Sequence, residues 1–262
     1  MKIQDFKRKK QEQSKISMIT CYDYPSARIV SESKIDCVLV GDSVAMTVHG
    51  HSTTVMATME MMVLHTQAVA RGLGQKFLIS DLPFLAHKGS KSETVANVRS
   101  LLQAGAQGVK IEGGDSDSCK TIAHLVSAGI PVIGHIGLTP QSIHQLGGYK
   151  VQGKNSEQAS ILMEQAIQLE EAGCFALVIE CVPQVLAANI SEQLTIPTIG
   201  IGAGSGTDGQ VLVWHDLLGL QTELKPRFVK QFAQGKQLLL NSINAYAEQV
   251  QHLQFPASEH AF

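Results

Sequence analysis

The sequence predicts a single-domain α/β fold, a (β/α)8 (TIM) barrel, on three observations. Eight short apolar segments recur along the 262 residues, and segments with helical patterning separate nearly all of them. Alternating strands and helices indicate a parallel sheet. Eight such units in about 250 residues fit a closed barrel, with an open doubly wound sheet as the alternative. No low-complexity linker divides the chain, so we expect one domain over residues 1–262.

The first half of the chain supplies an N-terminal element, four strands and three helices. A polar helix or arm covers residues 1–14. Thr58 is the predicted cap of a helix that Gly72 would stop. Ser90 and Glu93 form a capping box that opens the next helix. The predicted strands of this half are 15–23, 37–43, 76–83 and 108–114, and its predicted helices are 25–33, 58–71 and 90–105.

The second half repeats the alternation. Its predicted strands are 131–138, 175–182, 198–202 and 210–214, and its predicted helices are 116–128, 156–172 and 183–194. The connection between the last two strands is too short for a normal helix, so we expect an irregular or single-turn link. Pro226 begins a long amphipathic helix, predicted over residues 226–251.

Composition excludes several classes of partner. The net charge is −2 and no basic cluster stands out, which argues against a nucleic-acid partner. No apolar run approaches the roughly 18 residues of a membrane span. The five cysteines contain no C-x-x-C pair, so we interpret them as buried free thiols of a reducing compartment. These features predict a soluble, cytoplasmic protein.

The strand over residues 108–114 carries an unusual pair of charges. Side chains alternate along a strand, so Lys110 and Glu112 share one face while Val109 and Ile111 share the other. A strand buried in a parallel sheet is expected to be apolar on both faces. Buried charges are costly without partners, so this face either meets water or holds something that needs charge.

Polar residues recur at the ends of the other predicted strands. The ends or final turns contain Asp23, Asp42 with Ser43, Asp81, His135, Glu180, and His215 with Asp216. In a barrel, the C-terminal strand ends form one mouth, where active sites are built. A single aspartate there is often only a turn residue, but recurrence on at least five strands is a stronger signal.

Three of these carboxylates predict a metal site. Asp42, Asp81 and Glu112 end consecutive strands, which lie roughly 5 Å apart. Carboxylates that close require a compensating cation, and an all-oxygen ligand set favours Mg²⁺. The alternative is that some of them are caps or turn residues.

Lys110 has three possible roles: a Schiff-base nucleophile, an anion clamp or a structural partner of Glu112. The acidic surroundings favour the clamp.

Glu180 and His135 are the candidate residues for proton transfer and substrate orientation. Glu180 ends a very apolar run, and burial would make it a stronger base. A carboxylate bonded to local backbone is an equal alternative. His135 either orients a substrate or fills the barrel mouth. The glycine-rich run 200–209 contains one G-x-G-x-x-G match, but a strand follows it, so we reject a dinucleotide site.

Several motifs in register resemble the ketopantoate hydroxymethyltransferase family. They are Gly41–Ser43, Ser80–Phe84, Val109–Gly114, Gly134–Gln141, Gly147–Gly153, Glu180–Pro183 and Ile199–Gly204. The resemblance runs from about residue 15 to 255. It implies a (β/α)8 barrel and a reaction that transfers a hydroxymethyl group from 5,10-methylenetetrahydrofolate to 3-methyl-2-oxobutanoate. A Mg²⁺-stabilised enolate would carry the reaction, which gives 2-dehydropantoate for pantothenate biosynthesis.

The resemblance also implies roles for individual residues. Asp42, Asp81 and Glu112 would bind one Mg²⁺ per subunit. Asp42, Ser43, Asp81 and Lys110 would hold the keto acid, and we add His135 to this substrate-binding set. Glu180 would be the catalytic proton acceptor. The implied partners are the 2-oxo acid and the folate, with no nucleic acid or membrane, in a homo-oligomer, commonly a decamer.

The chain departs from the family pattern in the loop after the second strand. Ala45 stands where the family usually has glycine, and Met56-Ala57-Thr58 replaces a common Pro-Val-Thr. These changes put the conformation of the loop in question and leave the metal ligands intact. Two rival functions remain: a Mg²⁺-dependent 2-oxo-acid lyase or mutase of the phosphoenolpyruvate mutase type, and a non-catalytic barrel scaffold.

Overall fold

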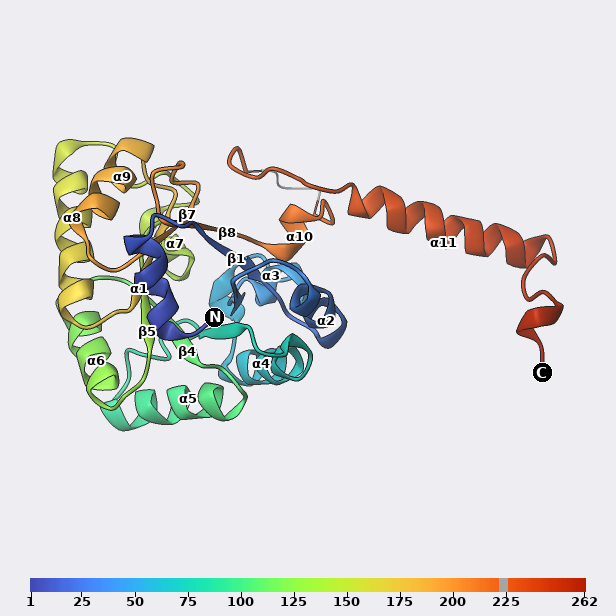
Figure 1. Ribbon diagram of the computed structural model, residues 1–262, viewed down its shortest axis with the longest axis horizontal. Helices are drawn as coiled ribbons and strands as arrows, with labels where there is room; N and C mark the ends of the chain where they lie inside the picture. The colour runs from blue at the N-terminus through green and yellow to red at the C-terminus, as the bar shows by residue number, and fades with distance from the viewer. Residues whose placement is uncertain (222–225) are drawn as a thin grey trace. The chain divides into compact units, whose positions relative to one another are not determined.

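The computed structural model describes residues 1–221 and 226–262 and confirms the closed barrel. Eight parallel strands follow one another in chain order, and β1 pairs with both β2 and β8, which excludes the open sheet (Figure 1). The strands are β1 Ile16–Thr20, β2 Cys37–Val40, β3 Phe77–Asp81, β4 Gly108–Glu112, β5 Val132–Gly137, β6 Ala176–Glu180, β7 Thr198–Ile201 and β8 Gly209–Leu212. Each lies within or one residue from its predicted range.

Helices surround the strands, and their caps follow the sequence signals. The Thr58 hydroxyl accepts a hydrogen bond from the Met61 amide, and Ser90 forms the predicted capping box with Glu93. The longer helices of the barrel are α1 Ile3–Gln11, α2 Tyr24–Glu32, α4 Met59–Leu73, α5 Lys91–Gln103, α6 Ser116–Ser127, α8 Ser156–Glu171 and α9 Gln184–Gln193. Residues 202–208 connect β7 to β8 without a helix, as expected.

Two predicted helix boundaries are wrong. Helix α4 continues through Gly72 to Leu73, and Gly74, whose φ is 68°, caps it. Gly72 is instead a site of close helix packing, because a Cβ there would lie 2.7 Å from the Tyr24 carbonyl oxygen of α2. The C-terminal helix α11, Gly235–Gln251, does not begin at Pro226. The amides of Phe232 and Gly235 bond to carbonyls of residues 217 and 218 rather than to helical partners.

The two long loops at the C-terminal strand ends contain short helical turns. The loop after β2 includes α3 Val44–Thr47 and η1 Thr54–Met56, and the loop after β5 includes η2 Pro140–Ser142 and α7 Ile143–Leu146. Ala45 is buried in α3 with no positive φ, so alanine fits this helical position without strain. The family departure at Ala45 therefore leaves the backbone beside Asp42 regular.

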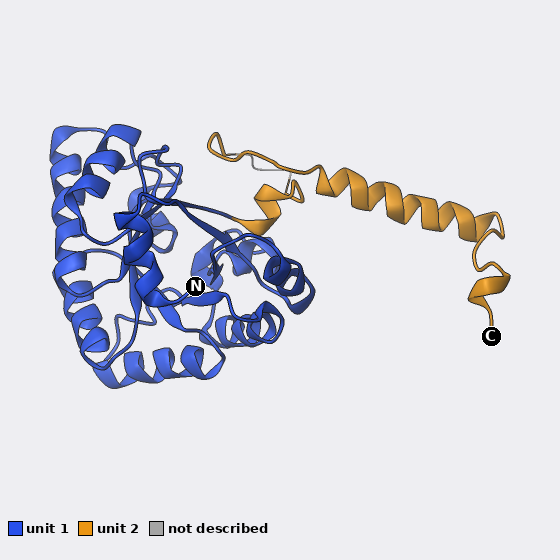
Figure 2. Ribbon diagram, viewed as in Figure 1, with its two compact units in different colours: residues 1–212 blue, residues 213–262 orange. Residues whose placement is uncertain are grey.

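The chain divides into two compact units, residues 1–212 and 213–262 (Figure 2). The first unit is the complete barrel, which is a single domain. The second contains α10 Trp214–Leu217, α11 and the short η3 Ser258–His260. None of the described helices is long and apolar enough to cross a bilayer.

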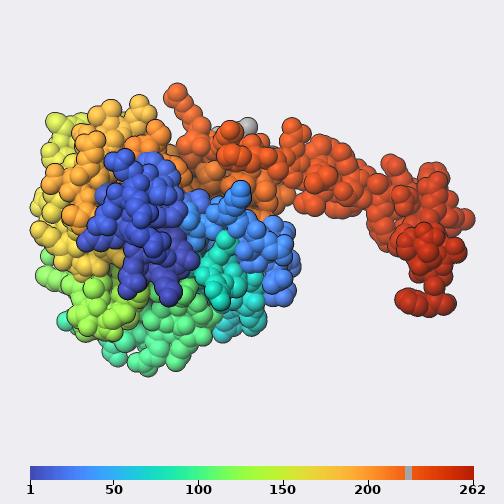
Figure 3. Space-filling view, viewed as in Figure 1, coloured from blue at the N-terminus to red at the C-terminus, as the bar shows by residue number. Residues whose placement is uncertain are grey.

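An apolar core fills the N-terminal half of the barrel. Phe6 of α1 is fully buried, and its ring centroid lies 5.4 Å from that of Phe77 and 4.9 Å from that of Phe175. The N-terminal residues, dark blue in Figure 3, lie over this part of the barrel unit. Around Phe6 the core contains Ile16, Met18, Cys37, Leu39, Ile79, Ile133, Ala176, Val178, Ile199 and Val211. The predicted polar N-terminal helix therefore packs one aromatic residue into the barrel core.

Along the strands, the apolar core of the barrel interior is followed directly by a layer of polar residues. Ile79 is followed two residues later by Asp81, and Val178 is followed by Glu180, so each pair faces the barrel interior. In the register, Asp81 pairs with Lys110 of β4. The C-terminal half of the barrel interior is therefore charged where the N-terminal half is apolar.

Candidate active site

Six predicted residues gather at the C-terminal ends of the strands. We call them the mouth cluster: Asp42, Asp81, Lys110, Glu112, His135 and Glu180. The first five are buried, with 2–5% of each residue exposed, whereas the Glu180 side chain is 17% exposed. The predicted burial of Glu180 is thus only partial, and its carboxylate faces both the cluster and the opening.

Lys110 lies among three partners. Its Nζ atom is 3.1 Å from Asp81 Oδ1, 3.5 Å from Glu112 Oε1 and 3.1 Å from His135 Nδ1. Burial opposes its charge, but Asp81 and Glu112 hold the pKa of Lys110 above its usual range. An ammonium group is not a nucleophile, so these contacts favour the anion-clamp or structural-partner interpretations over the Schiff base.

The three carboxylates exceed the charge that Lys110 supplies. Burial, then repulsion from Asp81 and Glu112, raises the pKa of Asp42 well above its usual value. Burial also raises the pKa of Asp81, although Lys110 opposes this shift. Burial acts to raise the pKa of Glu112 too, but Lys110 and His135 outweigh it and lower that pKa. The cluster therefore favours an additional cation.

His135 lies between two glutamates. Its Nδ1 atom is 3.2 Å from Glu112 Oε1, and its Nε2 atom is 3.3 Å from Glu180 Oε2. Burial and the Lys110 charge would lower the pKa of His135, but the two glutamates raise it to about 9. His135 thus does more than fill space in the mouth, because it contacts both the deep carboxylates and the partly exposed one.

Gln141 is a site residue that we did not single out from the sequence. Its backbone amide donates to Glu112 Oε2 at 3.1 Å. Its side-chain Nε2 donates to Asp42 Oδ2 and to the Leu82 carbonyl oxygen, both at 2.9 Å. The only signal for it was its place in the motif 134–141, because a neutral residue in a loop has no periodic pattern.

Two tyrosines also lie near the mouth and were not predicted. Tyr22 is buried, which raises its pKa to about 12, and its hydroxyl is 2.8 Å from the Ser43 hydroxyl. The Tyr149 hydroxyl donates to Met46 Sδ at 3.6 Å, which joins the loop after β5 to the loop after β2. Burial, then Glu180 and Asp42, raises the pKa of Tyr149. The two long loops therefore meet close to the mouth cluster.

The donor chemistry of the mouth cluster fits a divalent cation held by few protein ligands. Among the described residues, no group of three His, Cys, Asp or Glu side chains forms a ready-made metal cage. Asp81 Oδ1 and Glu112 Oε1 are buried and already face cationic groups, because Lys110 Nζ lies 3.1 Å and 3.5 Å from them and His135 Nδ1 lies 3.2 Å from Glu112 Oε1. These oxygens are hard donors, and the three carboxylates carry more charge than Lys110 balances. Asp42, Asp81 and Glu112 are therefore suitable ligands. Water or substrate would fill the remaining coordination positions of the cation.

A histidine of the loop after β2 contacts a histidine of α4. His49 is exposed, and its Nε2 atom is 2.9 Å from that of His65 on α4.

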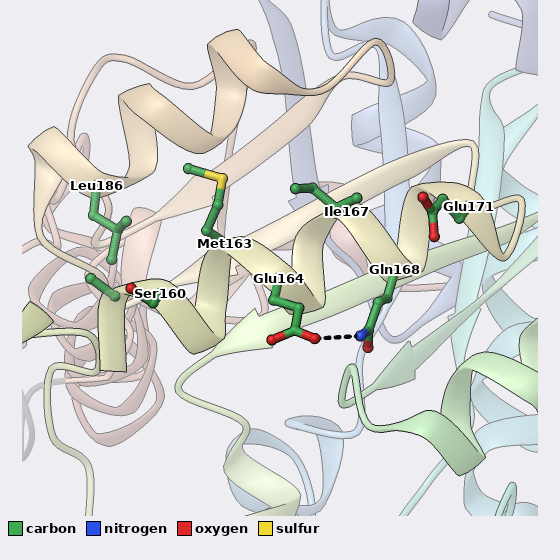
Figure 4. Close-up of a pocket in the computed structure, with 8 residues that line it drawn as sticks. Ser160, Met163, Glu164, Ile167, Gln168, Glu171 and Leu186 are labelled. Atoms are coloured by element: carbon green, nitrogen blue, oxygen red, sulfur yellow. Dashed lines mark hydrogen bonds between the residues drawn. The ribbon is translucent and has the colours of Figure 1, made fainter. Parts of the chain in front are cut away.

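Two surface cavities in the described part of the chain have no residue of the mouth cluster in their walls. A groove of about 600 Å³ lies on α8 and α9, where Met163, Ile167 and Leu186 line it (Figure 4). Gln168 Nε2 donates to Glu164 Oε1 along the same face at 3.0 Å. A second cavity of about 520 Å³ lies beside the ends of β4 and β5, with Gly113 and Gly137 in its wall. Neither replaces the mouth cluster as the candidate site.

The fold and the mouth cluster define a (β/α)8-barrel enzyme with buried carboxylates and a buried lysine at its strand ends. Residues 1–258 match the family model described as ketopantoate hydroxymethyltransferase. The chain belongs to this family, so the protein is an enzyme, a hydroxymethyltransferase. The alternative of a non-catalytic scaffold is therefore wrong.

Curated relatives cover the whole chain. A 3-methyl-2-oxobutanoate hydroxymethyltransferase of Legionella pneumophila (strain Paris) is 72% identical over 262 residues, which are 100% of both chains. One from Coxiella burnetii (strain CbuG_Q212) is 51% identical over 259 residues, covering 99% of this chain and 97% of the relative.

Solved structures support the barrel fold. A phosphonopyruvate hydrolase in complex with oxalate and Mg²⁺ has a TM-score of 0.63 at 10% identity, covering 98% of this chain and 92% of that one. A 2,3-dimethylmalate lyase of the PEP mutase/isocitrate lyase superfamily has a TM-score of 0.62 at 15% identity, covering 99% and 88%. At these identities the similarity shows the fold alone.

Proposed function

We propose that this hydroxymethyltransferase acts on 3-methyl-2-oxobutanoate with 5,10-methylenetetrahydrofolate as donor and Mg²⁺ as cofactor. One observation carries the proposal: His135 connects the partly exposed carboxylate of Glu180 to the buried charges of Lys110 and Glu112. A base that substrate can reach thus lies beside a cation that can stabilise negative charge. This combination suits proton removal next to a carbonyl group.

The keto acid binds against the charged end of the barrel. The Lys110 ammonium attracts the substrate oxygens, and its position is fixed by Asp81 and Glu112. Asp42, Ser43 and His135 complete the predicted substrate-binding set. Since these residues are held by buried contacts, the substrate would meet a largely preorganised surface.

Glu180 takes the proton from C3 of the keto acid. Its carboxylate is oriented by His135 and remains partly exposed, so a substrate in the opening can reach it. The electron pair left at C3 delocalises onto the keto oxygen, where Lys110 stabilises the developing charge. The resulting enolate carbon then forms a bond to the one-carbon unit of the folate as one of that carbon's two C–N bonds breaks. Hydrolysis of the second C–N bond releases tetrahydrofolate.

Asp42, Asp81 and Glu112 would hold the Mg²⁺. When bound, this cation would polarise the keto group and lower the cost of removing the C3 proton. The proposal rests on the excess of buried carboxylates over Lys110, which raises the pKa of Asp42 well above its usual value. The complete conversion consumes one water molecule, whose oxygen becomes the new hydroxyl group. The products would be 2-dehydropantoate and tetrahydrofolate, so we propose that the enzyme serves pantothenate biosynthesis, in the cytoplasm.

We also propose a homo-oligomer, a decamer as in the family. Helix α11 has no buried residue, and it exposes Leu239, Ile243, Tyr246 and Val250 along one stripe at helical spacing. An apolar stripe of this length needs a partner surface, and a second copy of the chain would supply it.

The reaction is tested by its product. Purified protein is incubated with the keto acid, methylenetetrahydrofolate and Mg²⁺, and 2-dehydropantoate is measured by mass spectrometry. We expect product only when all three are present. Cleavage or rearrangement of a 2-oxo acid without folate, and no 2-dehydropantoate, would instead support the lyase or mutase alternative.

A further inference from the structure

Gln141 joins the loops that follow four neighbouring strands. It lies in η2 after β5 and is only 5% exposed. It donates its three hydrogen bonds to Glu112 at the end of β4, to Asp42 after β2 and to Leu82 after β3. Two of these partners are proposed metal ligands, and the third directly follows Asp81.

The orientation of the Gln141 amide follows from its partners. Both groups that face Nε2 are acceptors, a carboxylate oxygen and a backbone carbonyl oxygen. Rotating the amide would place Oε1 against these two acceptors, which is unfavourable. Both side-chain N–H groups are therefore committed, and they hold Asp42 at a fixed position relative to the end of β3.

The hydrogen bonds select particular oxygens of the carboxylates. Gln141 contacts Oδ2 of Asp42 and Oε2 of Glu112 and leaves the second oxygen of each outside its reach. The second oxygen of Glu112, Oε1, is buried and faces the cationic side of the cluster, with Lys110 Nζ at 3.5 Å and His135 Nδ1 at 3.2 Å. The Gln141 donors are neutral, so they orient the carboxylates without cancelling their negative charge. A lysine in the same place would cancel part of the charge that binds a cation.

We propose that Gln141 is a positioning residue for the divalent cation: it orients Asp42 and Glu112 so that one oxygen of each remains available as a ligand. This inference rests on the proposed function, because it assumes that these carboxylates bind the metal. Partners that orient metal ligands typically contribute 10–100-fold to metal affinity.

The test is Mn²⁺ binding to full-length protein in the absence of substrate, measured from the electron paramagnetic resonance signal of free Mn²⁺. Gln141→Met keeps the length of the side chain but removes both of its donors. Gln145→Met is the matched control, because Gln145 is an exposed residue of α7. Melting temperatures in excess chelator confirm that each variant is folded. Gln141→Asn, which withdraws the amide by one methylene, replaces Gln141→Met if that variant does not fold.

We expect the Mn²⁺ dissociation constant to rise 10–100-fold in the Gln141 variant and to stay within twofold of wild type in the control. We also expect the Mg²⁺ concentration for half-maximal rate to rise, with kcat largely recovered at saturating Mg²⁺. Equal Mn²⁺ affinity in folded variant and wild type would overturn the positioning role and leave the proposed function intact. Absence of Mn²⁺ binding to wild type would overturn the metal site itself.

Discussion

The Nε2 atom of His135 lies 3.3 Å from the Oε2 atom of Glu180. The opposite ring nitrogen of His135 contacts Lys110 and Glu112, so the imidazole is fixed from both sides. Only 2% of the His135 side chain is exposed, whereas Glu180 is the most accessible member of the mouth cluster. A buried, charged set of residues therefore orients the one carboxylate that a substrate can reach.

This relationship predicts a specific defect for Glu180→Gln. The amide preserves the shape of the side chain but cannot accept the C3 proton, so we expect turnover to fall by about 10²–10⁴-fold. Binding of Mn²⁺ and of the keto acid should remain close to wild type, as measured by titration calorimetry. The matched control is Glu164→Gln on the outer face of α8. Normal turnover in Glu180→Gln would remove Glu180 from the role of base.

Asp81→Ala is expected to weaken metal binding. It removes a buried carboxylate that is one of the three proposed metal ligands and that contacts the Lys110 ammonium through Oδ1. The Mg²⁺ concentration for half-maximal rate should rise by roughly tenfold or more. Asp117→Ala on α6, where the side chain is 73% exposed, serves as the control. If the Mg²⁺ dependence is the same in Asp81→Ala and wild type, Asp81 is not a metal ligand.

Lys110→Met should lower the free energy of unfolding, and by more at neutral pH than at acidic pH. Without the ammonium, three buried carboxylates repel one another, and we expect a loss of about 3–5 kcal/mol at neutral pH. Burial and mutual repulsion already raise the pKa of Asp42, and the substitution would raise that of Asp81 further. A raised pKa means that the folded state binds more protons than the unfolded state, so the variant regains stability as pH falls from neutral toward about 4.

Urea unfolding at several pH values, in excess chelator, measures this effect. Lys120→Met on the outside of α6 is the control and should match wild type. A constant difference between Lys110→Met and wild type across this range would show that Lys110 does not compensate the carboxylates.

Ile243→Asp should weaken the assembly of subunits. The substitution places a charge in the apolar stripe of α11, where we propose that a second copy binds. We expect smaller species in sedimentation velocity and a dissociation constant at least about tenfold higher. Asn244→Asp adds the same charge at the next residue of the helix, outside the stripe. Equal assembly of Ile243→Asp, Asn244→Asp and wild type would exclude the stripe as a subunit interface.

The mouth cluster was predictable because charged residues interrupt apolar strands at the same end of each strand. Lys110 and Glu112 in particular violate the pattern of a buried strand. Gln141 and Tyr22 follow no such rule: one is a neutral loop residue, and the other becomes buried only when loops pack together. Their contacts depend on tertiary structure, which strand and helix patterns do not encode.

The errors in helix boundaries have a similar origin. Gly72 has the residue type of a helix stop, but the close approach of α2 requires glycine inside α4. Residues 226–234 have helical patterning, but the Phe232 amide bonds to the Leu217 carbonyl instead of to a helical partner. In both places a contact between distant parts of the sequence overrides the local preference.

The central claim is that the mouth cluster removes the C3 proton of the keto acid with the help of a divalent cation. The most direct measurement follows the C3–H signal of 3-methyl-2-oxobutanoate by NMR in D₂O, without folate, with wild type and Glu180→Gln. We predict Mg²⁺-dependent loss of this signal with wild type and its retention with excess chelator or with Glu180→Gln. Exchange that is equally fast in Glu180→Gln, or in wild type without metal, would contradict the account.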